Sequence, residues 1–298
     1  MPQREIPVIL AGCGYTGSRT GRLWKAAGHR VWCLVRTGAS AARAAQAGLI
    51  PVRCDLDSQE PLPSLPVREA MICYFVPPPR RDQDTRLRRF LRGLEPQGLP
   101  RTFLYISTSG VYGDSNGQWV TEATPPHPET ARARRRVDAE RTLQAWAAGR
   151  DVRAVILRVP AIYGPDRIPV QKIRDKVPVL RWEDAPFSNR IHVDDLAQIC
   201  VTAALAGDRN QVFNVSDGDP RRVTDYYFTV ADLLGLDRPP AISMAEALWT
   251  MSPMRLSFLR ESRRIDNRQL LDSLDIALQY PSLESGVTAS LRAMNLIR

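Results

Sequence analysis

Short apolar runs and amphipathic stretches alternate through the first half of the chain. Each run is the pattern of a strand buried on both faces, and each stretch that follows it ends near glycine or proline. This alternation predicts an α/β fold, a Rossmann-type doubly wound parallel sheet with helices on both faces. The strands are expected at residues 6–12, 29–35, 49–55, 69–76, 101–107 and 151–159, and the helices at residues 15–27, 39–47, 82–94 and from about 128 onward.

Beyond Pro160 the pattern becomes irregular. One clear helix follows at 191–207, with Gly207 as its stop, and one further strand is expected at 211–217. We therefore predict a second, smaller lobe that binds substrate. The main, NAD(P)-binding domain comprises residues 1–160 and 189–217, and the smaller C-terminal lobe comprises residues 161–188 and 218–298.

Composition adds a strong positive charge to this picture. The 298 residues include 41 Lys and Arg against 32 Asp and Glu, a net charge of +9. The arginines are spread along the whole chain, without a basic stripe interleaved with aromatic residues, so no nucleic-acid partner is expected. No run of 18 apolar residues occurs, and no membrane span is expected. The N-terminal apolar run is typical of a first strand rather than of a signal peptide, which favours a cytoplasmic protein.

Cysteine and histidine spacing is uninformative for metal chemistry. The five cysteines are scattered without a C-x-x-C pair, which favours reduced thiols over a disulfide framework. Three histidines occur without the spacing of metal ligands, so no metal site is expected.

The segment "GCGYTG" forms a G-x-G-x-x-G motif directly after the first strand and at the start of a helix. In this context the first glycine makes the tight turn, the second admits a pyrophosphate, and the third permits close helix–strand packing. The helix N-terminus supplies free N–H groups. The motif predicts dinucleotide binding by Gly12, Cys13, Gly14, Tyr15, Thr16 and Gly17.

The end of the second strand bears on the choice of cofactor. An NAD-preferring site usually has a carboxylate there, but this strand ends at Val35-Arg36-Thr37-Gly38, with Ser40 and Arg43 close behind. An arginine suits a 2′-phosphate, so NADP is favoured over NAD. The alternative is that Arg36 stacks on the adenine or faces solvent.

Several later motifs add to the glycine loop. They are "YISTSGVYGD" (105–114), "VTEATPPHPET" (120–130), "LRVPAIYGP" (157–165), "NRIHVDDLA" (189–197) and "VFNVSDGDP" (212–220). With them the chain resembles, over nearly its whole length, the extended short-chain dehydrogenase/reductase superfamily, in its NAD-dependent epimerase/dehydratase group. The C-terminal stretches "SRRIDNRQLLDSL" and "YPSLESG" resemble an atypical subgroup.

The resemblance implies a Ser or Thr at the end of the fifth strand that hydrogen-bonds the substrate oxygen. The matching position is Thr108, flanked by Ser107 and Ser109; the alternative is that these hydroxyls satisfy a turn. Further cofactor contacts are expected at Arg36, Thr37, Asp55, Leu56, Val76, Pro77, Ser107, Arg136, Val159, Pro160 and Ile162.

The same resemblance implies a catalytic Tyr-x-x-x-Lys pair on the next helix. Counting back from the family's acidic residue, matched by Glu140, the Lys position falls on Arg136 and the Tyr position on Arg132. Arginine keeps its proton, so Arg132 cannot act as a general base. Arg136 can donate to ribose hydroxyls and Arg132 can bind a carboxylate or phosphate. The alternative is that both pair with local acids, Glu129 or Asp138.

Helical periodicity supports this placement. Ala139, Leu143 and Trp146 form an apolar stripe that should face the sheet, and the stripe continues into Arg136 and Arg132. The residues expected on other sides are Arg134 and Arg141, in solvent, and Val137, for which a partner subunit is one candidate neighbour.

Another group must then move the proton if the protein is an enzyme. Tyr112 is the first choice, and the other candidates considered are Tyr163, Glu122 and His127. Residues His192, Asp194 and Asp195 are expected to cap a helix and brace the sheet. The catalytic candidates are therefore Thr108, Tyr112, Arg132 and Arg136.

Two functional hypotheses follow. The first is an NADP-dependent oxidoreductase or epimerase-like enzyme that acts on a small polar substrate, for which an anion is one candidate. The second is a non-catalytic NADP-binding sensor or regulatory protein, because the Tyr/Lys pair is missing. A homodimer is left open by both hypotheses.

Overall fold

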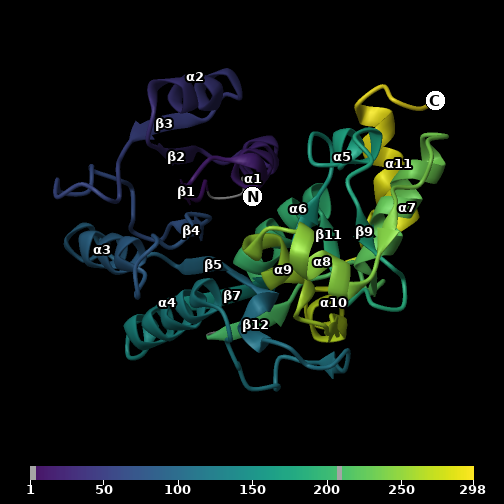
Figure 1. Cartoon of the computed structure of the whole chain (residues 1–298). Helices are drawn as coiled ribbons and strands as arrows, with labels where there is room; N and C mark the ends of the chain where they lie inside the picture. The colour runs from purple at the N-terminus through teal and green to yellow at the C-terminus, as the bar shows by residue number, and fades with distance from the viewer. Residues whose placement is uncertain (1–4, 207–209) are drawn as a thin grey trace.

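Seven parallel strands form the central sheet of the computed structural model, which describes residues 5–206 and 210–298 (Figure 1). The strand order is β12-β7-β5-β4-β1-β2-β3, and every neighbouring pair is parallel. The strands are β1 (Val8–Ala11), β2 (Val31–Val35), β3 (Ile50–Arg53), β4 (Met71–Tyr74), β5 (Thr102–Thr108), β7 (Arg153–Val159) and β12 (Gln211–Asn214). The predicted doubly wound parallel sheet is confirmed.

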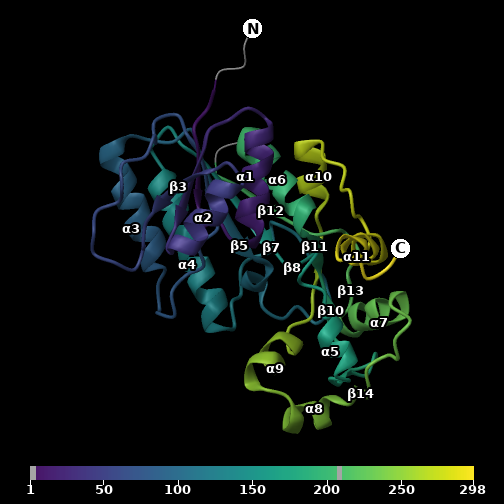
Figure 2. The same cartoon turned by 90° about the horizontal axis from the view of Figure 1, so that it is seen from above.

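Helices cover both faces of this sheet, which explains why its central strands are apolar throughout. Residues Trp24, Ile199 and Leu157 belong to one core layer, and Phe90, Leu143 and Ile156 to the other. The first face carries α1 (Tyr15–Ala26), α2 (Gly38–Gln46), α6 (Val193–Ala206) and α10 (Arg268–Leu274). The second carries α3 (Thr85–Leu94) and α4 (Ala131–Ala147). Viewed from above, the sheet lies between the α3–α4 pair and the α1–α6 pair (Figure 2).

The remaining elements are short. They are η1 (Glu95–Gln97), η2 (Ser109–Tyr112), β6 (Trp119–Val120), β8 (Ala161–Tyr163), α5 (Val170–Arg174), β9 (Val179–Leu180), β10 (Phe187–Ser188), β11 (Arg190–His192), β13 (Arg221–Arg222), α7 (Val223–Leu233), β14 (Ala241–Ile242), α8 (Met244–Thr250), α9 (Pro253–Leu259), β15 (Arg264–Ile265) and α11 (Leu283–Ala293). Two-stranded pairs join β10 to β13, β11 to β8, β14 to β9 and β15 to β6. Figure 2 shows α5, α8, α9 and β14 lying away from the sheet.

The segment 218–298 contributes to both parts of the molecule. Leu270 and Leu274 of α10 lie in the core layer beneath α6, and β15 pairs with β6, which precedes α4. Helices α7 and α11 instead pack with α5 around a separate apolar cluster. The domain boundaries drawn from the sequence stay a prediction. Gly207, expected to end the helix now seen as α6, lies outside the described residues.

Helix α4 has the orientation that its apolar stripe predicts. Ala139, Leu143 and Trp146 lie in the core layer between the helix and the sheet, and Arg134 and Arg141 are exposed. The expectation for Val137 is wrong. This side chain is 5% exposed and packs with Val111, Tyr112, Val120 and Ile265 of the same chain. Residues of the segment after β5, of β6 and of β15 therefore cover the Val137 side chain within the chain itself.

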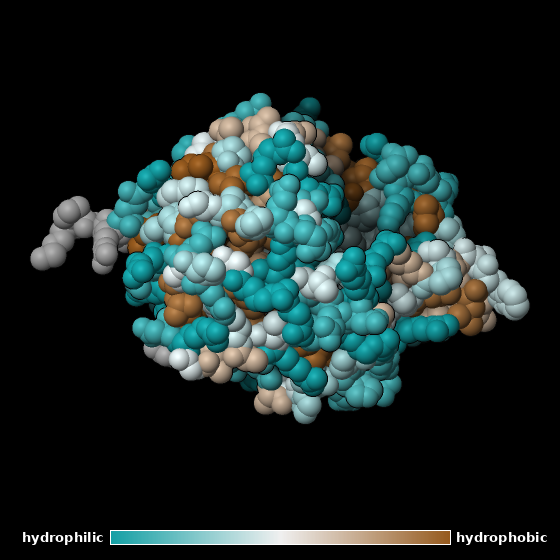
Figure 3. All heavy atoms as spheres, turned by 90° about the vertical axis from the view of Figure 1, so that its left-hand side faces the viewer, coloured by the Kyte–Doolittle hydropathy of each residue, from teal (hydrophilic) through white to brown (hydrophobic). Residues whose placement is uncertain are grey.

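The molecular surface is mainly hydrophilic on the face shown in Figure 3, where apolar residues form small separate groups. Among residues 5–206 and 210–298, no helix is both long and apolar enough to cross a membrane. The same residues contain no cluster of His, Cys, Asp or Glu that could hold a metal ion. The five cysteines are free thiols.

Candidate cofactor and substrate sites

The glycine loop lies at the point where the strand order reverses. From β1 the chain runs to β2 and β3 on one side, whereas β4 and β5 lie on the other, so the ends of β1 and β4 border a crevice. Gly12 has φ +94°, and a Cβ on Gly17 would lie 2.3 Å from the Gly12 carbonyl oxygen. Gly14 is the N-cap of α1, has no side-chain cap and faces open space. The loop therefore offers free N–H groups to an anion.

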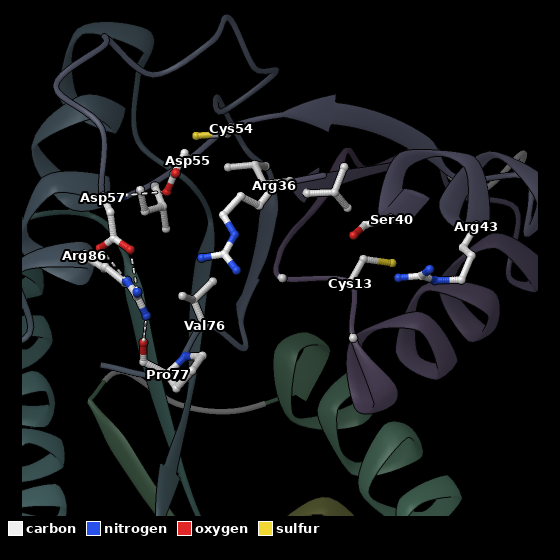
Figure 4. A pocket seen from close by; sticks show the side chains of 15 residues that line it. Cys13, Arg36, Ser40, Arg43, Cys54, Asp55, Asp57, Val76, Pro77 and Arg86 are labelled. Carbon is white, nitrogen blue, oxygen red and sulfur yellow. Dashed lines mark hydrogen bonds and ion pairs between the residues drawn. The ribbon is translucent and has the colours of Figure 1, made fainter. Parts of the chain in front are cut away.

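A pocket of about 340 Å³, here called the cofactor pocket, adjoins this loop (Figure 4). Its lining is Gly12, Cys13, Gly14, Leu34, Val35, Arg36, Ser40, Arg43, Cys54, Asp55, Leu56, Asp57, Val76, Pro77 and Arg86. Eight of these residues are among the cofactor contacts expected from the sequence. The pocket thus joins the glycine loop to the ends of β2, β3 and β4, where parallel sheets of this type bind nucleotides.

Charges in the cofactor pocket are distributed unevenly. Asp57 is neutralised by Arg86, whose Nη2 lies 2.5 Å from Oδ2 and whose Nη1 donates to the Pro77 carbonyl at 2.9 Å. The hydrogen bond from Arg86 lowers the pKa of Asp57. Arg36 extends from the end of β2 toward Val76, and Arg43 reaches from α2 toward Cys13 (Figure 4). Neither arginine forms an ion pair with any residue that the structure describes.

Other expected cofactor residues have local partners. The Tyr15 hydroxyl donates to the Pro165 carbonyl at 2.6 Å, and the Thr37 hydroxyl caps α2 by accepting from the Ser40 N–H at 3.2 Å. Ser107 is buried and donates to Glu140 Oε1 at 2.5 Å. The expected contacts that do not line the cofactor pocket are Tyr15, Thr16, Gly17, Thr37, Ser107, Arg136, Val159, Pro160 and Ile162.

A second cavity of about 340 Å³, here called the interlobe cleft, lies at the carboxyl end of β5. Its lining is Thr108, Ser109, Gly110, Arg132, Pro160, Ala161, Pro186, Phe187, Ser188, Asn189, Arg190, Val223, Phe258, Leu259, Glu261 and Arg263. The cleft therefore brings together Thr108, Arg132 and Pro160 of the residues expected from the sequence. Thr108 Oγ1 also accepts from the Gly110 N–H at 3.2 Å, the turn contact considered as its alternative role.

The two arginines expected at the Tyr and Lys positions have different surroundings. Arg132 Nη1 donates to Ser257 Oγ at 3.0 Å, and its guanidinium lies 3.7 Å from the centroid of the Phe258 ring. Arg136 Nη1 donates to the Tyr105 hydroxyl at 2.9 Å and to the Ile106 carbonyl at 2.8 Å. Burial lowers the pKa of Arg132.

The alternative of pairing with local acids is not what the structure shows for Arg132 and Arg136. Asp138 pairs with Arg88 at 2.7 Å. Glu129 accepts from the Asp114 N–H and lies 3.8 Å from His127.

Tyr112 does not lie in the cleft. Its hydroxyl is 2.7 Å from Asn214 Oδ1, to which it donates, and accepts from Arg158 Nη1 at 2.9 Å. Arg158 in turn pairs with Glu140 at 2.8 Å, with both side chains under 10% exposed. Burial raises the pKa of Tyr112. This network joins three strands to α4. Because the Tyr112 hydroxyl proton is already used in the bond to Asn214, Tyr112 is not the group that we propose for proton transfer.

The other candidates for proton transfer also lie outside the cleft lining. Glu122 accepts from the Asn214 N–H at 2.7 Å, His127 is exposed, and Tyr163 is buried against His192. Burial lowers the pKa of His192 to about 4. Asp194 pairs with Arg19 of α1, and Asp195 accepts from the N–H groups of residues 279 and 280, so both side chains join α6 to neighbouring segments. Their expected roles in capping a helix and bracing the sheet stay predictions.

Three charged residues of the cleft were not singled out from the sequence. They are Arg190, Glu261 and Arg263. Glu261 is 9% exposed, accepts from both terminal nitrogens of Arg263 through Oε2, and has no partner for Oε1 among the described residues. Arg190 stands in the quoted "NRIHVDDLA" motif, for which the sequence predicted roles only for His192, Asp194 and Asp195. Arg263 stands in the quoted "SRRIDNRQLLDSL" stretch, and Glu261 directly precedes that stretch.

Fold and cofactor pocket together define a Rossmann-type dinucleotide-binding protein. Within this class, residues 87–216 match the NAD dependent epimerase/dehydratase family, which confirms the resemblance drawn from the motifs. A conserved protein of unknown function from Silicibacter pomeroyi has a TM-score of 0.85 and 28% identity, over 96% of this chain and 99% of that one. The dTDP-glucose 4,6-dehydratase of Bacillus anthracis, solved in complex with NAD, has a TM-score of 0.75 and 15% identity, over 97% and 96% of the two chains. The latter similarity shows a shared fold.

Curated relatives extend the comparison. The GDP-6-deoxy-D-mannose reductase of Pseudomonas aeruginosa is 25% identical over 263 residues, which are 78% of this chain and 81% of that protein. The chain spans about a quarter of the length of the trifunctional UDP-glucose 4,6-dehydratase proteins of Arabidopsis thaliana that it matches at 22–24% identity.

Proposed function

We propose that this protein is an NADP-preferring oxidoreductase or epimerase-like enzyme that acts on a small anionic molecule in the interlobe cleft. The observation that carries the proposal is that the cofactor pocket and the interlobe cleft both lie at the carboxyl end of the sheet strands. The cofactor pocket has unpaired arginines, and the cleft has a carboxylate beside Arg132 and Thr108.

The residues of the cofactor pocket fit a dinucleotide phosphate. The loop N–H groups at Gly14 suit the pyrophosphate, and Arg36 suits a 2′-phosphate because no carboxylate neutralises it. Asp57, an acid in this pocket, is already paired with Arg86 and is therefore less repulsive to the phosphate. A bound nicotinamide cofactor would supply hydride exchange with a substrate carbon. The Nη2 and Nε atoms of Arg136 have no partner among the described residues and can donate to ribose hydroxyls.

The cleft supplies groups that orient a substrate. Thr108 can hydrogen-bond the substrate oxygen, as the family position implies, and Arg132 can bind a carboxylate or phosphate by exchanging its contact with Ser257 for a stronger charged one. The relatives named above act on nucleotide-linked sugars, and a substrate of that kind is anionic. A cavity of about 340 Å³ is within the range of small-molecule sites.

Glu261 is our candidate for the proton-transfer group. It is the carboxylate that lines the cleft, and its Oε1 is buried without a hydrogen-bond partner among the described residues. Burial lowers the pKa of Arg132 and the charge of Glu261 opposes this shift, so the two groups lie close enough to interact, which supports a place for this carboxylate beside the substrate. A carboxylate within hydrogen-bond reach of a substrate hydroxyl can accept its proton, which Arg132 cannot do.

The second candidate function is a non-catalytic NADP sensor. The observation in its favour is that Arg132 and Arg136 occupy the positions of the catalytic Tyr and Lys. A sensor binds NADPH as tightly as the enzyme does, but it does not oxidise the cofactor with any member of a panel of nucleotide-linked 4-keto sugars. Loss of NADPH absorbance with one member of the panel supports the enzyme.

Cofactor binding is tested by the melting temperature of the full chain and by calorimetric titration. We expect NADPH to raise the melting temperature much more than NADH. Arg36→Gln should weaken NADPH binding about tenfold or more, the value of one charge-assisted hydrogen bond, and leave NADH binding unchanged. Arg141→Gln, on the solvent side of α4, is the matched control. Equal shifts with both cofactors, or none, would remove the NADP assignment.

A further inference from the structure

The interlobe cleft contains a buried arginine whose charge has no direct partner. Arg190 begins β11, lines the cleft and is 6% exposed. Its guanidinium makes no hydrogen bond or ion pair with any residue in the described ranges. Its one recorded contact is with Tyr226, whose ring centroid lies 4.2 Å from the guanidinium carbon. A buried cation of this kind is costly unless an anion neutralises it.

Asp217 is a carboxylate that acts electrostatically on Arg190, but it does not neutralise the Arg190 charge through an ion pair. Asp217 lies just after β12 and is buried. Burial lowers the pKa of Arg190 and the charge of Asp217 opposes this shift, but the two side chains form no ion pair. Asp217 Oδ1 accepts from the Asp219 N–H at 3.1 Å, and Oδ2 has no partner among the described residues. Burial raises the pKa of Asp217 to about 7, so its compensating charge is incomplete near neutral pH.

The other charges of the cleft leave an excess of positive charge. Arg263 is paired with Glu261 through two bonds of 2.9 Å. Arg132 contacts Ser257 and the Phe258 ring, and no carboxylate. Arg132 and Arg190, neither of which has a carboxylate partner among the described residues, therefore both line one cavity of about 340 Å³. Their arrangement is complementary to a small anion.

We propose that Arg190 binds a carboxylate or phosphate group of the molecule that occupies the interlobe cleft. The inference rests on the proposed function for the location of the substrate, but anion binding requires no turnover. The planar guanidinium offers two parallel N–H donors to either anion, and stacking on Tyr226 holds the orientation of its plane. The desolvation cost of Arg190 is then offset when the anion binds.

The test is calorimetric titration of the full chain with inorganic pyrophosphate and, separately, with malonate. Saturating NADPH is present so that the cofactor pocket is filled. We expect the wild-type protein to bind one or both probes, which distinguishes phosphate from carboxylate recognition. Arg190→Gln should weaken this binding at least tenfold, and Arg190→Lys should weaken it less because it keeps the charge without the planar pair of donors. Arg141→Gln should bind like the wild type.

A second readout separates ligand binding from a structural role. Without an anion, Arg190→Gln should melt at the wild-type temperature or above it, since the substitution removes an uncompensated buried charge. The proposal is overturned if the wild-type protein binds neither probe, if Arg190→Gln binds them as tightly as the wild type, or if Arg190→Gln melts at a lower temperature. If Arg190→Gln does not fold, Arg190→Lys decides the matter by the same titration. If the wild type fails to bind NADPH but still binds a probe anion without NADPH, and Arg190→Gln abolishes that binding, the result counts against the proposed function alone.

Discussion

The buried network beneath the cleft gives the sharpest stability prediction. Glu140 and Arg158 are 4% and 7% exposed in their side chains and are joined by a bond of 2.8 Å, with two more contacts of 3.3 Å. Ser107 donates to the same carboxylate at 2.5 Å. The substitution Glu140→Gln keeps the size of the side chain but removes its charge, and it turns an amide N–H₂ toward donors of Arg158. Arg158 is then left as an uncompensated buried cation.

The expected magnitude follows from this burial. Breaking a buried ion pair by removing one partner costs about 3–5 kcal/mol, which corresponds to a fall in melting temperature of about 10 °C for a chain of this size. Urea denaturation followed by circular dichroism, together with a thermal melt, measures both quantities.

The matched control is Asp232→Asn, which breaks the ion pair with Arg238. The side chains of Arg238 and Asp232 are 57% and 48% exposed. We expect that change to leave the free energy of unfolding nearly unchanged, because water screens the pair. The double variant Glu140→Gln with Arg158→Met should recover part of the loss, since no charge then remains buried. If Glu140→Gln loses no more stability than Asp232→Asn, the reasoning about this network is refuted.

Two further predictions concern single carboxylates. Glu261→Gln should abolish cofactor oxidation in the substrate panel while NADPH binding changes little. Because it also leaves the largely buried Arg263 without its carboxylate partner, it should lower the melting temperature, and turnover is therefore measured well below that temperature. Glu246→Gln, on exposed α8, should leave turnover intact; unchanged turnover in Glu261→Gln excludes it as the proton-transfer group. Asp217 has its pKa raised by burial from 3.8 to about 7, so the folded state binds more protons than the unfolded state between these values, and the free energy of unfolding falls as pH rises through this window. Over the whole window the difference is on the order of 4 kcal/mol, of which about 3 kcal/mol lies above pH 5, and Asp217→Asn should remove it. Urea titrations of both proteins at pH 5 and pH 8 check this slope, and parallel pH dependence in the two proteins would contradict it.

Local patterns were sufficient for the sheet and for the glycine loop. Buried parallel strands are apolar along their whole length, and the turn after β1 needs residues without a Cβ, as the 2.3 Å approach to the Gly12 oxygen shows for Gly17. Both requirements act within a few residues, so they are written directly in the sequence. The stripe of α4 is equally local. It predicted that Arg132 and Arg136 face the sheet; Arg136 contacts β5, whereas Arg132 contacts α9.

Only the tertiary structure decided which side chains meet in the cleft and which hydroxyls are free. The bond between Tyr112 and Asn214 joins residues 102 positions apart. The cleft likewise brings Thr108, Arg190 and the locally paired Glu261 and Arg263 together from distant segments. The position of Val137 depends in the same way on β15. The periodicity of apolar residues predicts which face of a helix or strand is buried. The hydrogen-bond partner of a buried polar group depends instead on long-range packing. The sequence alone therefore determined a dinucleotide-binding fold, and tertiary packing decided the chemistry of its substrate cleft.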